Sequence, residues 1–147
     1  NIGNGRKLWS TTTALERPTL VAGAGEEPQH LSSIDGKLYF SARSELGREL
    51  WVANGNSATL AADINPGSGS SSPKEFTTIN HWVNQNIEKY LYFSATDGAR
   101  GVELWSLNLS TNNSVPKRHA DILSGPSSSD PRQITNADEQ LYFTADD

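Results

Sequence analysis

Two short phrases decide the fold, Leu38-Tyr39-Phe40-Ser41-Ala42 and, a little further on, Glu49-Leu50-Trp51. Both return in the same order as Leu91-Tyr92-Phe93-Ser94-Ala95 and Glu103-Leu104-Trp105. The first appears once more as Leu141-Tyr142-Phe143-Thr144-Ala145, and the second has a counterpart near the start, Lys7-Leu8-Trp9. The chain is therefore a repeat protein, and its architecture has to be worked out from the repeating unit.

Each unit carries four phrases in a fixed order. The Leu-Trp phrase is followed by an apolar run, then by a polar loop that leads into a proline, and finally by the Leu-Tyr-Phe phrase. Pro28 and Leu38 are 10 residues apart, and so are Pro131 and Leu141. The middle unit needs 18 residues between Pro73 and Leu91. Its eight extra residues lie within residues 80–89, where a turn has gained an insertion.

Every phrase has the character of a short strand, so three units predict twelve strands. The Leu-Tyr-Phe phrases are rich in aromatic residues and are bounded by polar turns. Asp35-Gly36 is a tight hairpin signal immediately before the first of them. No segment shows a sustained apolar period of 3.6 residues, so we expect no long helix. For the insertion at residues 81–89 we expect a single helical turn.

These features predict an all-β, β-propeller-type repeat of three four-stranded units, with approximate limits 1–43, 44–96 and 97–147. The Leu-Tyr-Phe phrases are 53 and 50 residues apart, a spacing typical of propeller blades. The Gly/Ser/Pro-rich loops 65–73 and 124–131 recur in phase, so we interpret them as connections between blades. The units are circularly out of phase, because the chain opens on the third strand of one blade and stops after the second strand of another.

Three blades fall short of the 4–8 that normally close a ring. The chain is expected to be part of a larger propeller, or to complete its half blades with those of neighbouring chains. The sequence contains no Met, which indicates a processed chain or an interior piece of a longer one.

Composition excludes several functional classes. The chain has 147 residues, a formal charge of -5 and no cysteine, so disulfides, thiolate chemistry and Cys-based zinc sites are ruled out. No stripe of Lys and Arg is present, so we expect no nucleic-acid partner. No apolar run approaches the roughly 18 residues of a membrane span.

The repeated phrases resemble those of the ELWxxDGT-repeat proteins, a hyalin-like family of mostly bacterial surface and exported proteins. Asp63-Ile64-Asn65-Pro66-Gly67-Ser68 and the two Glu-Leu-Trp phrases match the family pattern closely. The Asp-Gly-Thr part departs from it, with Asn54 and Asn108 at the aspartate position. The resemblance implies propeller-like repeats, an extracellular or cell-surface location and a role in adhesion, with no shared enzyme activity.

Aromatic residues provide the candidate ligand contacts. Trp9, Trp51 and Trp105 recur in phase, and we expect them to pack between blades, the alternative being one sugar-stacking site per blade. Trp82 lies outside the repeat, in the polar insertion. Trp82 and Tyr90 are the candidates for ligand contact if they are exposed, and packing over the blade edge is the alternative.

Asp63, Asn65 and Asp121 are weak calcium candidates, because they offer oxygen ligands beside the Gly/Ser loops. No closely spaced acidic run supports a calcium site, and hydrogen bonding to turn backbone is the competing interpretation. The three histidines occupy different places in the three units, so they predict neither a zinc site nor a catalytic triad. We expect no cofactor and no resident metal.

The sequence therefore favours a non-enzymatic binding, adhesion or structural module that acts through protein–protein contacts. Its partner would be another protein or further blades of the same protein. A lectin-like carbohydrate-binding propeller is the first alternative. A propeller enzyme whose site is completed by blades outside this chain is the second.

Overall fold

The computed structural model describes residues 5–12, 16–120 and 122–147, and all named strand pairs in it are antiparallel. The twelve predicted strands are present. They are β1 (Trp9–Ser10), β2 (Thr19–Leu20), β3 (Glu26–Ile34), β4 (Lys37–Ser44), β5 (Gly47–Asn54), β6 (Ser57–Ala62), β7 (Lys74–Val83), β8 (Asn86–Ala95), β9 (Glu103–Asn108), β10 (Lys117–Ala120), β11 (Arg132–Ala137) and β12 (Gln140–Thr144). In the described part of the chain, no helix is long and apolar enough to cross a membrane.

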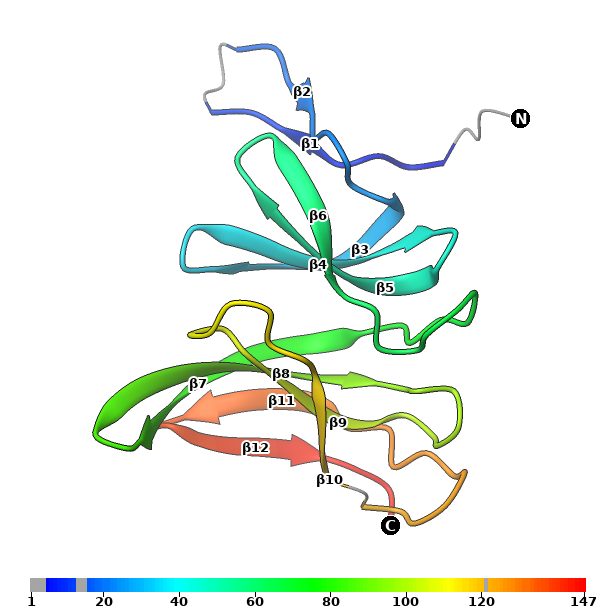
Figure 1. Ribbon diagram of the computed structural model, residues 1–147, viewed down its shortest axis with the longest axis vertical. Coiled ribbons are helices and arrows are strands. Elements are labelled where there is room, and N and C mark those ends of the chain that lie inside the picture. The colour runs from blue at the N-terminus through cyan, green and yellow to red at the C-terminus, as the bar shows by residue number, and fades with distance from the viewer. Residues whose placement is uncertain (1–4, 13–15, 121) are drawn as a thin grey trace.

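The strands form two four-stranded sheets, in the orders β3-β4-β5-β6 and β10-β9-β8-β7, with a two-stranded sheet at each end of the stack. Figure 1 shows the pair β1–β2 at one end, the two complete sheets in the middle and the pair β11–β12 at the other end. By position in the repeat, β1–β2 are the third and fourth strands of a sheet, and β11–β12 are the first and second. The predicted phase is therefore correct, and the described residues do not close a ring.

The two phrases pair with each other in the same register in both complete sheets. Phe40 lies opposite Trp51 across β4 and β5, and Phe93 lies opposite Trp105 across β8 and β9. In each sheet the indole Nε1 of the tryptophan donates a hydrogen bond to the alanine carbonyl that ends the Leu-Tyr-Phe phrase. The distance is 3.1 Å from Trp51 to Ala42 and 2.9 Å from Trp105 to Ala95. The phrases are therefore the two middle strands of one sheet.

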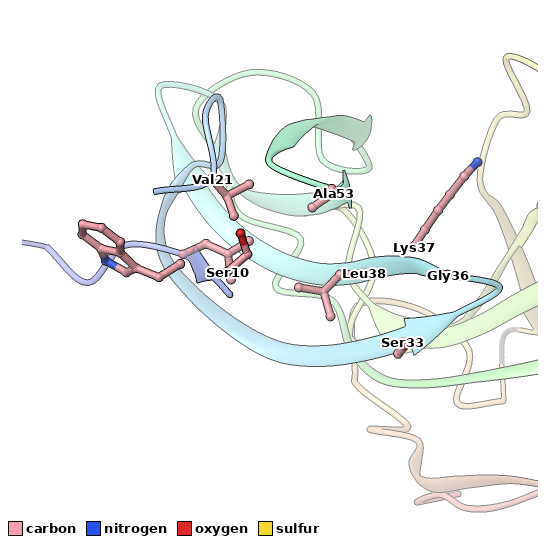
Figure 2. A pocket seen from close by; sticks show the side chains of 10 residues that line it. Ser10, Val21, Ser33, Gly36, Lys37, Leu38 and Ala53 are labelled. Atoms are coloured by element: carbon pink, nitrogen blue, oxygen red, sulfur yellow. The ribbon is translucent and has the colours of Figure 1, made fainter. Parts of the chain in front are cut away.

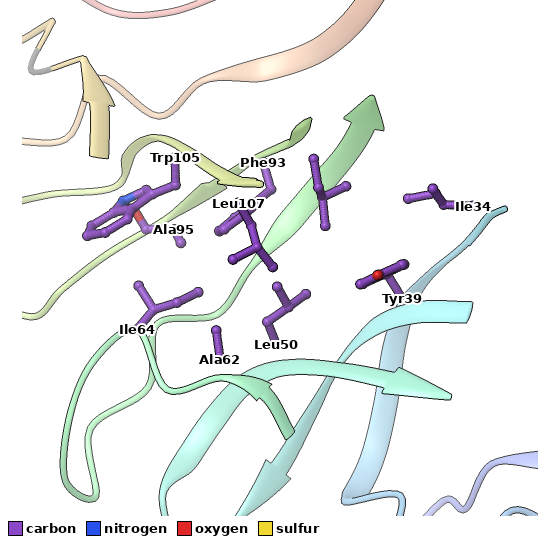
Figure 3. Packing of buried hydrophobic residues seen from close by; sticks show 10 residues of the cluster. Ile34, Tyr39, Leu50, Ala62, Ile64, Phe93, Ala95, Trp105 and Leu107 are labelled. Atoms are coloured by element: carbon purple, nitrogen blue, oxygen red, sulfur yellow. The ribbon is translucent and has the colours of Figure 1, made fainter. Parts of the chain in front are cut away.

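The main core lies between the two complete sheets. Figure 3 shows side chains of the first sheet, among them Tyr39 and Leu50, facing Phe93 and Trp105 of the second. Tyr39 of the first sheet packs in this cluster with Leu91 and Phe93 of the second, and Tyr92 of the second sheet clusters with Ile134 and Leu141 of the pair β11–β12. Two similar but smaller clusters lie between the complete sheets and the two-stranded sheets at the ends.

The expectation that the three repeated tryptophans pack between blades is met at two of them. Trp105 is buried and Trp51 is half-buried, whereas Trp9 is exposed. Trp9 belongs to the end sheet, and none of the described residues forms a sheet beyond it. The expectation of a core position is therefore wrong for Trp9, because no sheet among the described residues covers it.

The insertion forms no helical turn, and that prediction is wrong. Residues 80–89 instead extend the hairpin of β7 and β8, with Trp82 opposite Ile87 and Val83 opposite Asn86. The turn residues Asn84 and Gln85 both have positive φ, 48° and 67°. Two such residues form the two-residue turn whose twist matches that of a hairpin. The ladder continues through the insertion because this turn allows it.

A buried glutamate ties each complete sheet to the loop that follows it. Glu49 is fully buried, and its carboxylate accepts hydrogen bonds from the backbone N–H of Ile64 (2.8 Å) and from both the N–H (2.8 Å) and the hydroxyl (2.6 Å) of Ser71. Glu103 is also fully buried and binds Ser129 in the same way, at 3.0 Å and 2.6 Å. These glutamates fix the long polar loops against the sheet edge.

Candidate binding surface

The hairpin of β7 and β8 projects past its neighbours. Figure 1 shows it reaching further than the β3–β4 and β11–β12 hairpins on the same side of the molecule. Near its tip, Trp82 is 77% exposed, and its cross-strand neighbour Ile87 is also exposed. A large aromatic side chain left in water beside another apolar side chain is typical of a contact surface. The sequence made Trp82 a candidate for ligand contact on the condition that it is exposed, and it is exposed.

A cluster of aromatic and imidazole rings lies at the base of this hairpin. The ring centroid of His81 is 5.3 Å from that of Tyr90 and 6.0 Å from that of Tyr92, and both pairs pack edge to face. His81 Nε2 and the Tyr92 hydroxyl are 2.9 Å apart, within hydrogen-bonding distance. The ring of His119, on β10, also packs edge to face against Tyr92, and these two ring centroids are 5.2 Å apart. Side chains from three strands thus form one polar aromatic surface.

Hydrogen bonds fix the second candidate, Tyr90, in this cluster. Its hydroxyl donates to Glu88 Oε2 at 2.8 Å, and Asn108 Nδ2 donates to the same carboxylate oxygen at 2.7 Å. The bond to Glu88, followed by burial, raises the pKa of Tyr90. Burial raises the pKa of Tyr92. Both phenols are therefore neutral at pH 7 and can serve as hydrogen-bond donors.

The cluster borders an open depression of about 470 Å³. Its lining combines ring faces with cationic and hydroxyl groups, contributed by His81, Trp82, Val83, Tyr90, Tyr92, Ser106, Lys117, Arg118 and His119. Trp82 and Tyr90 both border this depression, but the register places their side chains on opposite faces of the hairpin, because His81 packs on Tyr90 and Trp82 is the next residue along the strand. Ring faces with nearby donors suit an apolar or aromatic side chain of a protein, and they also suit the face of a sugar.

Three members of this surface were not foreseen from the sequence. His81 and His119 were set aside because they fall at different places in the units, and Tyr92 was treated only as a strand residue. Adjacency to Trp82 was a signal for His81. No sequence signal linked His119 to this surface, because only the pairing of β10 with β9 brings His119 to this side of the sheet.

A second polar row lies on β3, β7 and β11, which are edge strands of their sheets. His30, Glu75 and Gln133 occupy the same place on β3, β7 and β11, and each has a positive φ, 52°, 62° and 54° respectively. Such a conformation costs a non-glycine residue of order 1–3 kcal/mol. The row is linked by a 2.6 Å bond from the Gln133 backbone N–H to Glu75 Oε2. The strand pairing shifts register next to each of these residues, so the bulge belongs to the repeat rather than to one unit.

The calcium candidates do not form a cluster. Among the described residues, no three His, Asp or Glu side chains gather as a metal site. Asp63 Oδ1 is buried and makes no hydrogen bond. The side chain of Asn65 lies against Gly69 and Gly98, where it fills the space between two loops. Asp121, the third candidate, lies outside the described residues.

No family model, curated protein or solved structure matches this chain. Its function therefore has to be argued from the geometry of the surfaces described above.

Proposed function

We propose that the chain is a β-propeller-type repeat module of the ELWxxDGT kind, located outside the cell or on a bacterial cell surface. In this proposal it acts without catalysis, by holding a protein partner. The propeller arrangement is supported by the face-to-face stacking of the two four-stranded sheets and by the shared bulge on β3, β7 and β11. The repeated phrases support the family and, through it, the location.

The observation that carries the binding role is the exposure of Trp82 on a hairpin that is longer than the equivalent hairpins of the neighbouring sheets. The ordinary turn between the first two strands of a sheet is the two-residue Asp35-Gly36, and residues 80–89 replace it in the second sheet. These residues do not contribute to the core between the sheets. Trp and Tyr are the residues most enriched among those that dominate the energy of protein–protein contacts. A hairpin extended to display Trp82 therefore fits a docking role.

The experiment compares labelled wild-type chain with Trp82→Ala for saturable binding to the surface of cells of the source organism. We expect the apparent Kd to rise about thirtyfold, as for loss of a central interface residue. Leu31→Ala is the matched control, because Leu31 is also exposed but lies on β3. Melting temperatures should be equal in all three proteins. Equal binding by wild type and Trp82→Ala would refute the proposed role.

A carbohydrate ligand is the second candidate, and the depression beside Tyr90 favours it. Ring faces and hydroxyl, imidazole and ammonium groups converge there as they do in sugar-binding sites. Treating the cells with protease or with periodate separates the two candidates. Binding lost after protease supports a protein partner. Binding lost only after periodate, and abolished by Tyr90→Ala, assigns the site to a glycan.

A further inference from the structure

The second complete sheet carries another extension, which lies beside the β7–β8 hairpin. The connection between β9 and β10 contains residues 109–116, whereas the equivalent connection of the first complete sheet contains residues 55–56 alone. Figure 1 shows the β9–β10 loop on the same side of the molecule as the hairpin. The Leu109 N–H donates to the Lys89 carbonyl at 2.8 Å, and the Lys89 N–H donates to Ser110 Oγ at 2.8 Å. These bonds join the loop to the hairpin.

A pocket of about 310 Å³ lies where the loop meets the sheet. The strands contribute Tyr90, Ser106, Asn108 and Lys117 to its lining, and the loop contributes Thr111, Ser114 and Val115. The pocket adjoins the depression described above, because Tyr90, Ser106 and Lys117 border both. The loop therefore adds a further wall to that surface.

Hydrogen bonds hold one wall of the pocket in place. Glu88 Oε2 accepts from the Tyr90 hydroxyl at 2.8 Å and from Asn108 Nδ2 at 2.7 Å. Asn108 Oδ1 accepts from the Ser110 N–H at 2.8 Å, which fixes the start of the loop. The polar groups of Tyr90 and Asn108 are thus already bonded, so Tyr90 offers the pocket its ring. A wall that is ordered before the ligand arrives reduces the entropy lost on binding.

The remaining polar groups of the lining are available to a ligand. Within the described part of the chain, four of them have no hydrogen-bond or ion-pair partner, namely the hydroxyls of Ser106, Thr111 and Ser114 and the ammonium of Lys117. Of the described residues that line the pocket, only Lys117 is charged. Beside these groups lies Val115, whose side chain is exposed. The pocket therefore combines hydroxyl groups and one cation with an apolar wall.

We propose that this pocket binds one acidic sugar unit, a pyranose that carries a carboxylate. Lys117 pairs with the carboxylate, the free hydroxyls bond to hydroxyls of the sugar, and Tyr90 and Val115 pack on the apolar face of its ring. The inference rests on the glycan candidate given above, and it names the class of sugar. It goes beyond docking through Trp82, whose side chain lies on the opposite face of the hairpin.

The lining selects this class of ligand over simpler ones. A neutral sugar leaves the ammonium of Lys117 without a counter-ion. A small carboxylate or an inorganic anion leaves the ring of Tyr90 and the side chain of Val115 uncovered. A charge-assisted hydrogen bond is roughly twice as strong as a neutral one. The carboxylate is therefore the group that decides between otherwise identical sugars.

This corner of a sheet stays open to solvent even beside a complete neighbouring sheet. The first complete sheet shows this, because the second one covers its equivalent face. The register assigns three of its residues to the places of Tyr90, Asn108 and Lys117, and all three are exposed, namely Lys37, Asn54 and Thr59. Figure 2 looks into a pocket of about 210 Å³ on the other side of this sheet, and the ammonium end of Lys37 extends out of it, away from Val21 and Ala53.

The first test titrates methyl glucuronide and methyl glucoside into the 147-residue chain and follows amide chemical shifts by NMR. The two sugars differ only in a carboxylate that replaces a hydroxymethyl group. We expect the glucuronide Kd to be about tenfold lower. Lys117→Met keeps the aliphatic stem and should make the two Kd values equal. Lys37→Met is the matched control and should change neither. Equal Kd values in wild type, or no effect of Lys117→Met, would overturn the proposal.

The second test separates the sugar contacts from the charge and from the docking role. Acetate should bind about tenfold more weakly than the glucuronide, because it has no ring to pack. Thr111→Ala combined with Ser114→Ala should weaken both sugars by the same factor, since these hydroxyls contact the part that the sugars share. Trp82→Ala should leave both Kd values unchanged, so failure of the sugar site is distinguishable from failure of docking. Acetate binding as tight as that of the glucuronide, or a double variant that binds like wild type, would contradict the assigned contacts.

Discussion

Replacing Glu49 by Ala tests whether the buried glutamate holds the loop after the first sheet. Truncation removes an acceptor of four donors, the N–H groups of Ile64, Asn65 and Ser71 and the hydroxyl of Ser71. Both Ser71 donors also reach the Arg48 carbonyl, at 3.1 Å and 3.3 Å, so the N–H groups of Ile64 and Asn65 are the two that lose their acceptor. Each donor left without an acceptor costs about 1–3 kcal/mol. Removing a buried carboxylate also removes its desolvation cost, so we expect the lower half of the sum for two donors, about 3 kcal/mol.

Urea unfolding followed by tryptophan fluorescence measures this loss. With an m-value of about 1–3 kcal/mol/M, the midpoint should fall by about 1–3 M while m stays constant. The matched control is Lys7→Ala, because Lys7 stands at the glutamate position of the first unit. There it pairs with Glu26 in an exposed salt bridge of 2.9 Å. Such a pair is worth about 0–1 kcal/mol. Equal losses in both variants, or a loss below about 1 kcal/mol for Glu49→Ala, would refute the reasoning.

Three further predictions concern the same framework. Gly47→Ala should lower the melting temperature strongly, because Gly47 has a φ of 87° and an added Cβ would lie 1.9 Å from the Gly69 carbonyl oxygen. Gly55 has a φ of 60° and open space around it, so Gly55→Ala should lower the free energy of unfolding by only about 1 kcal/mol. Trp105→Phe should cost about 1 kcal/mol in urea unfolding, because its Nε1 bond to β8 is lost. Burial raises the pKa of Glu49, so the folded state binds its proton more tightly than the unfolded state does. The free energy of unfolding should therefore fall as pH rises from the ordinary glutamate pKa to that of the folded state, and Glu49→Gln should remove this slope in urea titrations at stepped pH.

The strands, their order and the phase of the sheets could be predicted because they follow from repetition and spacing. The 10-residue interval between Pro28 and Leu38 recurs between Pro131 and Leu141. It locates the same pair of strands in both units. The longer interval of the middle unit located the insertion for the same reason. None of these inferences required knowledge of what each side chain touches.

The conformation of the insertion could not be predicted on the same grounds. Apart from His81, which packs on Tyr90 and Tyr92, its residues belong to none of the hydrophobic clusters, so burial imposes no apolar period on them, and the prediction had only local preferences to use. The turn at Asn84 and Gln85 lacks the glycine that usually marks a two-residue hairpin turn. The extended hairpin, and with it the exposure of Trp82, appears only in the structure.

The buried glutamates were missed although the sequence carried a signal for them. Glu49 and Glu103 stand at the same place in their phrases, and the serines they bind, Ser71 and Ser129, both lie two residues before a proline. The pairing was overlooked because the Glu-Leu-Trp phrase was interpreted only as a strand. In the first unit the glutamate position holds Lys7 and the serine position holds Glu26, and these two also pair. Two positions that change together in this way are expected to be in direct contact.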